Sequence, residues 1–312
     1  MKPKKEDQLF YFLCRSFASG RKETQSTQDL SGANLNWSYI RQKFIQEGLA
    51  GYAYVFLNTS VYKKYVPEGI LAKLKTDYYY ALLRNTLISQ EAERILGAFN
   101  QESIAVIPLK GVFLAESVYQ NIALRPSADI DLLIRKEDFS RTATLLDSLG
   151  YSLSLGCGDT LTEDALSLNS LMYVNKVTTS ALHLHWHLIN SVWPLESARD
   201  SIAMDEVWLK AKPGIIYGAK VFSLSADWLL LYLCHHCFKH YFAKLILSFD
   251  LIKVIEASRE EIDWDKLIED ANRLEMTAQL QYCFYYLSLR LHYFTPGLAK
   301  LKRQNASTRR MG

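Results

Sequence analysis

The chain has 312 residues, of which 49% are hydrophobic and 22% are charged, and its formal net charge is +3. This length suffices for one large or two modest domains, and so small a positive charge gives no reason to expect a nucleic-acid partner. Five cysteines at scattered spacings make no disulfide framework, and no stretch approaches the ~20 apolar residues of a membrane span. Because the N-terminus is basic and then acidic before any apolar run, we do not expect a secretory signal there. We therefore expect a cytoplasmic protein with no membrane partner.

The first hundred residues are predicted to be helical. Residues 9–17 are apolar and aromatic, residues 36–48 run from a helix start to a terminal glycine, and residues 70–99 carry apolar side chains at helical spacing. We interpret the tyrosines at 78–80 as part of a packed core face rather than as a surface for stacking on a base. No chemistry is assigned to this part of the chain.

Residues 104–135 hold the stretch on which a functional interpretation depends. An apolar run at 104–109 predicts a strand, a Lys-Gly pair ends it, and a helix is expected to follow. A turn is predicted around residues 125–127. After it, residues 129–134 alternate between polar and apolar side chains, which predicts a second strand.

Two aspartates lie at the start of this second strand. Because successive side chains of a strand point to opposite faces, Asp129 and Asp131 should emerge together while Ile130 enters the core. Neighbouring carboxylates repel each other unless a cation or a proton joins them, and oxygen ligands of this kind suit Mg²⁺ or Mn²⁺. A solvated pair of acids at a strand edge is the alternative interpretation.

Lys110 and Gly111, about one helix upstream, favour the metal interpretation. A strand, a glycine turn and a helix N-terminus present backbone N–H groups and a positive dipole to an anion. Gly111 permits close approach of the backbone, and Lys110 supplies a point charge to a phosphate. A phosphate-binding site beside a metal-binding site is the minimum required for phosphoryl or nucleotidyl transfer.

An ordered set of motifs is similar to a family of nucleotidyltransferases of the polymerase-beta superfamily, a family described only as uncharacterised. The set touches most of the chain after about residue 80. It comprises Leu109-Lys110-Gly111, Tyr119, Arg125, Asp129-x-Asp131-Leu132-Leu133, Gly150-Tyr151, His185-Trp186, Leu233-Cys234-His235-His236, Lys239-His240, Asp250 and Asp263-Trp264-Asp265. The resemblance implies a mixed sheet with helices, two aspartates that bind the metal of a nucleoside triphosphate, and a helical remainder. It does not supply the acceptor substrate.

Residues 181–189 alternate strictly, with histidines at 183, 185 and 187 on one face. The resemblance implies a third carboxylate from a neighbouring strand, in a pattern of acid-x-His-Trp that places the acid at His183. A neutral imidazole at that position can bind a metal, where it suits Mn²⁺ or Zn²⁺ better than Mg²⁺, or act as a base on the acceptor hydroxyl. An inactive relative is the third alternative. His185 matches the histidine of the family.

From residue 223 onward the chain is predicted to be helical again. Its run of Cys234, His235, His236, Cys237 and His240 suggests a zinc site, although structural zinc sites normally draw a second pair of ligands from another element. Buried thiols and core histidines are the favoured interpretation. Asp250 lies in an apolar run, where an unpaired charge is costly, so we expect it to pair with a histidine or an arginine.

We predict an α/β (α+β) fold, with a small mixed sheet of polymerase-beta type between helical N- and C-terminal parts. The expected division is a helical part at 1–100, a nucleotidyltransferase-like core at 101–222 and a helical part at 223–312.

The predicted reaction is metal-dependent transfer of a nucleoside monophosphate from ATP or another nucleoside triphosphate to an acceptor hydroxyl on a small molecule or a protein. Asp129 and Asp131 would hold Mg²⁺ or Mn²⁺, and Lys110 with the Gly111 backbone would hold the triphosphate. Arg125 would pair with phosphate or with Asp129, and His183 or His185 would complete the site. The alternative is a pseudoenzyme of the same fold that binds a nucleotide or a partner without turnover.

Overall fold

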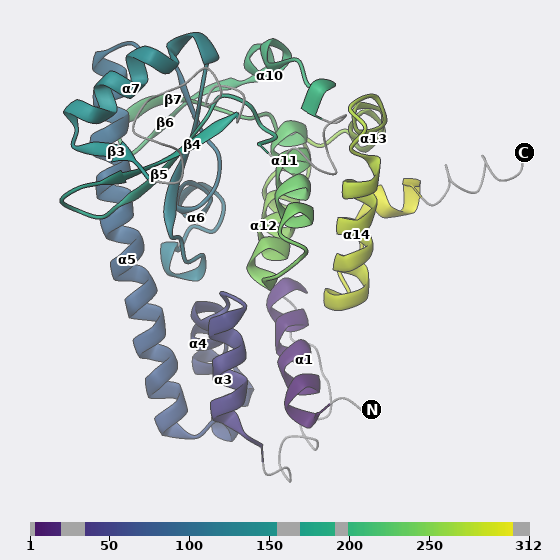
Figure 1. Cartoon of the computed structure of the whole chain (residues 1–312). Coiled ribbons are helices and arrows are strands. Elements are labelled where there is room, and N and C mark those ends of the chain that lie inside the picture. The colour runs from purple at the N-terminus through teal and green to yellow at the C-terminus, as the bar shows by residue number, and fades with distance from the viewer. Residues whose placement is uncertain (1–3, 20–34, 155–168, 191–198, 302–312) are drawn as a thin grey trace, which may run out of the picture.

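The computed structural model describes residues 4–19, 35–154, 169–190 and 199–301. A small mixed sheet stands above bundled helices, and one long helix runs beside both (Figure 1). The predicted α+β fold, a small mixed sheet between helical N- and C-terminal parts, is confirmed. In the described part of the chain, no helix is both long and apolar enough to cross a membrane.

The described helices and strands alternate along the middle of the chain and give way to helices alone at both ends. The described α-helices are α1 (Lys5–Ser19), α3 (Trp37–Gln46), α4 (Ala50–Thr59), α5 (Glu68–Gln101), α6 (Val112–Ser117), α7 (Phe139–Ser148), α10 (Met204–Lys210), α11 (Ala226–Lys239), α12 (Leu245–Ala257), α13 (Trp264–Arg273) and α14 (Thr277–Leu291). The strands are β1 (Val106–Pro108), β2 (Asp129–Ile134), β3 (Tyr151–Leu153), β4 (Ser170–Asn175), β5 (Ala181–His185), β6 (Lys212–Ile216) and β7 (Ala219–Ser223).

The five-stranded sheet has the order β1-β2-β5-β4-β3, and β6 and β7 form a separate hairpin. Strands β2 and β5 are parallel, while the other neighbours in the larger sheet are antiparallel. The parallel register sets Asp131 directly opposite His183. Residues directly opposite each other on neighbouring strands project to the same face, so this register decides which side chains meet Asp131.

Both faces of β2 are covered. Its Ile130, Leu132 and Ile134 pack with side chains of α5 and α7 in one core cluster. The opposite face carries Asp131 and Leu133, and Leu133 belongs to a second cluster that includes residues of α11 and α12. A strand that is buried on both faces leaves no solvated position in its middle. Asp131 is therefore placed between the sheet and the C-terminal helices.

The N-terminal and C-terminal helices share one core. Buried residues of α1, α3 and α4 lie in the same cluster as those of α11 to α14. Helix α5, 34 residues long, extends from α3 and α4 up to the sheet (Figure 1). The division of the chain at residues 100 and 222 stays a prediction.

The prediction of a core face was wrong for two of the three tyrosines on α5. Tyr79 and Tyr80 are 53% and 65% exposed. Tyr78 is partly buried, contacts the ring of Tyr54 and bonds to Asn121. Helix α5 has neighbours on only part of its circumference at this level, so Tyr78 faces α4 while Tyr79 and Tyr80 face solvent.

Candidate active site

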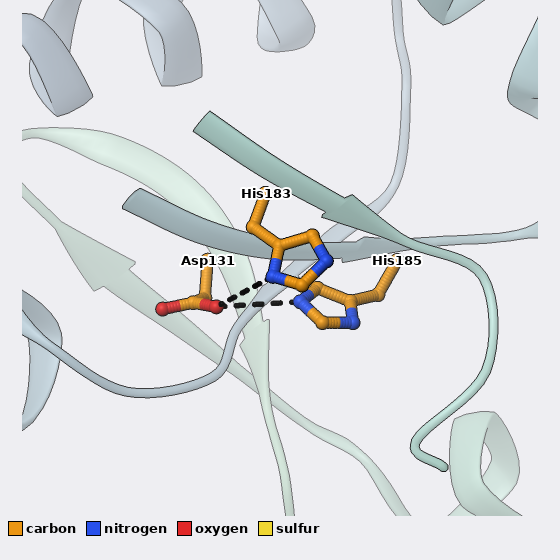
Figure 2. Close-up of side chains that lie close together, drawn as sticks. All are labelled: Asp131, His183 and His185. Carbon is orange, nitrogen blue, oxygen red and sulfur yellow. Dashed lines mark hydrogen bonds and ion pairs between the residues drawn. The ribbon is translucent and has the colours of Figure 1, made fainter. Parts of the chain in front are cut away.

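A buried carboxylate, an ammonium group and two imidazoles meet where β2 and β5 lie side by side. Asp131 is completely buried, and one of its oxygens, Oδ2, forms an ion pair with the Nζ of Lys110. The other oxygen, Oδ1, lies 3.3 Å from Nε2 of His185 and 3.6 Å from Nδ1 of His183. Figure 2 shows both imidazoles directed at this one carboxylate oxygen. Residues from three separate segments thus converge on one side chain.

The charge state of Asp131 follows from these neighbours. Burial alone would raise the pKa of its carboxyl group, but the ammonium group of Lys110 and the hydrogen bond with His185 outweigh burial and hold this pKa well below its usual range. Asp131 is therefore a carboxylate at neutral pH.

Asp129 has the opposite environment. Burial and the negative charge of Asp131 raise its pKa above the ordinary value. Within the ranges that the structure describes, a single group of three potential metal ligands is found, and it consists of Asp131, His183 and His185. Of the two aspartates predicted to hold the metal, only Asp131 belongs to this group. The role of Asp129 stays a prediction.

Polar contacts continue from His183 to α11. Nε2 of His183 lies 3.0 Å from Oγ of Ser170, which also accepts a hydrogen bond from Nδ2 of Asn190 at 3.0 Å. Lys239 on α11 donates to Oδ1 of Asn190 at 2.6 Å. Burial, the nearby His185 and the two lysines lower the pKa of His183 to about 3, so its imidazole is neutral. Sequence reasoning missed Ser170 and Asn190, which stand in no recognisable motif.

Gly111 turns the chain so that Lys110 faces Asp131. Its φ of +71° is the left-handed conformation that favours glycine, and a Cβ there would lie 3.3 Å from the carbonyl oxygen of Asp129. The predicted helix after Gly111 is present as α6, which ends at Ser117. The expected binding of triphosphate by Lys110 and Gly111 stays a prediction, since in this structure Lys110 is paired with Asp131.

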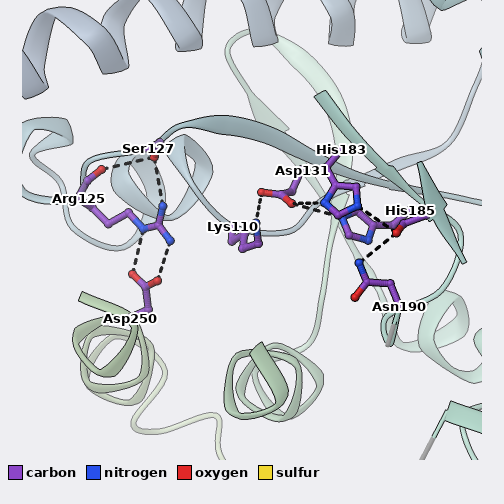
Figure 3. Close-up of polar contacts among 9 residues, drawn as sticks. Lys110, Arg125, Ser127, Asp131, His183, His185, Asn190 and Asp250 are labelled. Atoms are coloured by element: carbon purple, nitrogen blue, oxygen red, sulfur yellow. Dashed lines mark hydrogen bonds and ion pairs between the residues drawn. The ribbon is translucent and has the colours of Figure 1, made fainter. Parts of the chain in front are cut away.

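Arg125 forms a buried ion pair with Asp250 on α12. Its Nη2 and Nε donate to the two carboxylate oxygens at 2.8 and 3.2 Å, and Nη1 donates to Ser127 at 3.2 Å (Figure 3). The hydroxyl group of Tyr119 donates to the same carboxylate at 2.6 Å. The expectation that Asp250 pairs with an arginine or a histidine is confirmed, but the partner of Arg125 is Asp250 and not Asp129. A contact between Arg125 and a phosphate stays a prediction.

Asn85 on α5 also stabilises the turn at residues 125–127. Its side chain is completely buried, donates to the carbonyl groups of Ile122 and Arg125, and accepts a hydrogen bond from the backbone N–H of Ser127 at 3.1 Å. The turn that leads into β2 is therefore held by side chains of two helices, α5 and α12. A polar residue within an apolar helical stripe was the only sequence signal for Asn85.

The cysteines and histidines of residues 234–240 do not form a second candidate metal site in the described part of the chain. Cys234 and Cys237 are buried free thiols that pack near Cys283 of α14. His235 is buried too, and burial lowers its pKa to about 4. The interpretation as buried thiols and core histidines fits Cys234, Cys237 and His235, but it is wrong for His240, which is exposed.

A family model described as uncharacterised nucleotidyltransferase matches residues 33–292. The match includes every residue of the site described above. No curated protein matches the chain.

Solved structures show looser likenesses. The solution structure of the antibiotic-resistance factor ANT(2'')-Ia has 11% identity and a TM-score of 0.39, over 67% of this chain and 98% of that one. Its crystal structure with adenylyl-2''-tobramycin has 11% identity and a TM-score of 0.36, over 62% and 99%. An antigenic nucleotidyltransferase-like protein from Paracoccidioides brasiliensis has 16% identity and a TM-score of 0.38, over 67% and 92%. Likenesses at these TM-scores carry no detail over to the site.

Proposed function

We propose that this chain, which belongs to the family described as uncharacterised nucleotidyltransferase, transfers a nucleoside monophosphate from a nucleoside triphosphate to an acceptor hydroxyl. The acceptor oxygen forms a bond to the α-phosphorus, the bond from that phosphorus to the β-phosphate oxygen breaks, and pyrophosphate leaves. The acceptor hydroxyl loses its proton in the process. A small molecule or a protein side chain provides this hydroxyl.

One observation carries the proposal. The buried carboxylate of Asp131 lies between the ammonium group of Lys110 and the imidazoles of His183 and His185, on adjacent parallel strands. Transfer of a phosphoryl or nucleotidyl group depends mainly on positioning and on positive charge near the phosphates. This site brings Lys110 together with a group of side chains that can bind a cation.

The residues have distinct roles in the proposal. Asp131 holds a divalent cation, with Asp129 as the second carboxylate at the start of β2. Its Oδ1 and the two imidazoles are donors that fit such a cation, which when bound would neutralise charge on the phosphate oxygens. Lys110 and the Gly111 backbone receive the triphosphate. His183 completes the site, because its side chain is 21% exposed and reachable, whereas that of His185 is 4% exposed.

Arg125 supports this site through the backbone. Its ion pair with Asp250 and its bond to Ser127 hold the turn that places Asp129 and Asp131 at the start of β2. A change in this pair should therefore disturb the whole site and not a single contact to substrate.

A pseudoenzyme that binds a nucleotide or a partner without turnover is the second candidate. The identity of His183 favours this candidate. It lies opposite Asp131 in the register and carries a neutral imidazole, whereas the resemblance implies an acid at this position. A His183→Asp variant separates the two candidates. It should raise the rate of an impaired transferase and leave a pure binder without turnover.

Transfer itself is tested with radiolabelled triphosphates. The protein is incubated with ATP, GTP, CTP or UTP, labelled at either the α- or the γ-phosphate, together with extracts that supply small-molecule and protein acceptors. We expect the α label on an acceptor, the γ label in pyrophosphate, and neither with Asp131→Asn. A γ label on the acceptor would contradict the proposal, because it would mean phosphoryl transfer. His187→Asn is the matched control, since His187 bonds to Ile189 and lies outside the group of three ligands.

A further inference from the structure

We propose that Asp131, His183 and His185 bind Zn²⁺ in preference to Mg²⁺. The inference names the cation of the proposed function, and any role of that cation in transfer rests on the proposed function. Binding of the cation can nevertheless be measured without any nucleotide, so it can stand or fall separately.

The donor atoms decide the class of cation. The group offers one carboxylate oxygen and two imidazole nitrogens, all within 4.8 Å of one another. Mg²⁺ prefers an octahedron of oxygen ligands, whereas imidazole suits Zn²⁺ and its neighbours among the transition metals. Catalytic zinc sites commonly have three protein ligands and an open fourth position. In some enzymes the three ligands are two histidines and one carboxylate.

Two of the three separations between the donors, those from Asp131 to each histidine, agree with this class. Two bonds of about 2.1 Å at a tetrahedral angle place their ligand atoms about 3.4 Å apart. Two bonds of the same length at the right angle of an octahedron place them only about 3.0 Å apart. Oδ1 of Asp131 lies 3.3 Å from Nε2 of His185 and 3.6 Å from Nδ1 of His183. Both separations are closer to the tetrahedral value.

The groups behind the donors hold them in place. Lys110 occupies Oδ2 of Asp131 and so leaves Oδ1 for the cation. Ser170 contacts Nε2 of His183 and so leaves Nδ1 directed at the same point, while Asn190 donates to Ser170. Partners of this kind orient metal ligands and tune affinity by about 10–100-fold.

The three donors differ in their exposure to solvent. The side chain of His183 is 21% exposed, whereas Asp131 is completely buried and His185 nearly so. Of the three donors, His183 is therefore the one that solvent reaches most easily.

The experiment uses the full chain, freed of metal with a chelator and then dialysed. Co²⁺ is added as a spectroscopic probe of nitrogen ligation, and Zn²⁺ and Mg²⁺ are then tested as competitors without nucleotide. We expect Zn²⁺ to displace Co²⁺ at equimolar concentration and Mg²⁺ to fail at large excess. His183→Ala should lower the affinity for Co²⁺ by more than about tenfold, and His187→Asn should leave it unchanged.

His183→Asp gives a second, independent readout, because it replaces a nitrogen donor with an oxygen donor at a partly exposed position. It should weaken Zn²⁺ binding and strengthen Mg²⁺ binding. Zn²⁺ binding that is unchanged in His183→Ala, or Mg²⁺ that competes as well as Zn²⁺, would overturn the inference. Zn²⁺ binding without any triphosphate binding would support this inference and refute the proposed function. Triphosphate binding that requires Mg²⁺ and gains nothing from Zn²⁺ would support the proposed function and refute this inference.

Discussion

The buried ion pair between Lys110 and Asp131 should contribute strongly to stability. Asp131 has no exposed surface, and the side chain of Lys110 is 11% exposed. Asp131→Asn removes the negative charge with little change in shape and leaves a buried ammonium group without its partner. Breaking a buried pair in this way costs about 3–5 kcal/mol of the free energy of unfolding. Lys110→Met in the same chain removes the unpaired charge, so the double variant should recover much of that loss.

Urea unfolding of the wild type, both single variants and the double variant, in the presence of a chelator, measures this coupling. The control is the exposed pair of Lys212 and Glu261, whose side chains are 62% and 57% exposed. The matched changes Lys212→Met and Glu261→Gln should cost no more than about 1 kcal/mol. If Asp131→Asn costs as little as Glu261→Gln, the reasoning about the buried pair is wrong.

Two further predictions concern the supports of the site. Asp250→Asn leaves the buried guanidinium group of Arg125 unpaired and should cost about 3–5 kcal/mol, measured as a lower urea midpoint; a cost near zero would contradict the pairing. The pKa of His183 falls from 6.5 to about 3 on folding, because of burial and its charged neighbours. Between these values the unfolded chain binds more protons, so stability should fall as the pH drops below about 6.5. His183→Asn should make the fall of the free energy of unfolding with decreasing pH less steep. An unchanged slope would refute the statement that the pKa of His183 is lowered on folding.

Local patterns in the sequence predicted much of the structure around the site. The alternation at residues 129–134 and 181–185 identified both strands, and Lys110-Gly111 identified the turn between β1 and α6. These features depend on neighbours in the sequence, which a pattern can represent. The family resemblance placed His183 beside the aspartates, and the parallel register confirms that position.

Contacts between distant segments were outside the reach of such patterns. Arg125 and Asp250 are 125 positions apart. The sequence predicted an arginine or a histidine as the partner of Asp250, but it named phosphate or Asp129, and not Asp250, as the partner of Arg125. The contact of Ser170 with His183 depends on how β4 and β5 pair, which no motif records. The exposed Tyr80 was misread because helical spacing shows which residues share a face but not which face is covered.

Calorimetric titration with the four common nucleoside triphosphates, in the presence of Mg²⁺, Mn²⁺ or Zn²⁺, tests the central claim most directly. The variants are Lys110→Met/Asp131→Asn, in which the buried charges are removed together, and the control His187→Asn, with folding checked by circular dichroism. We predict cation-dependent binding of at least one triphosphate in the wild type and the control, and its loss in the double variant. Binding to no triphosphate, or binding that survives in the double variant, would contradict the account.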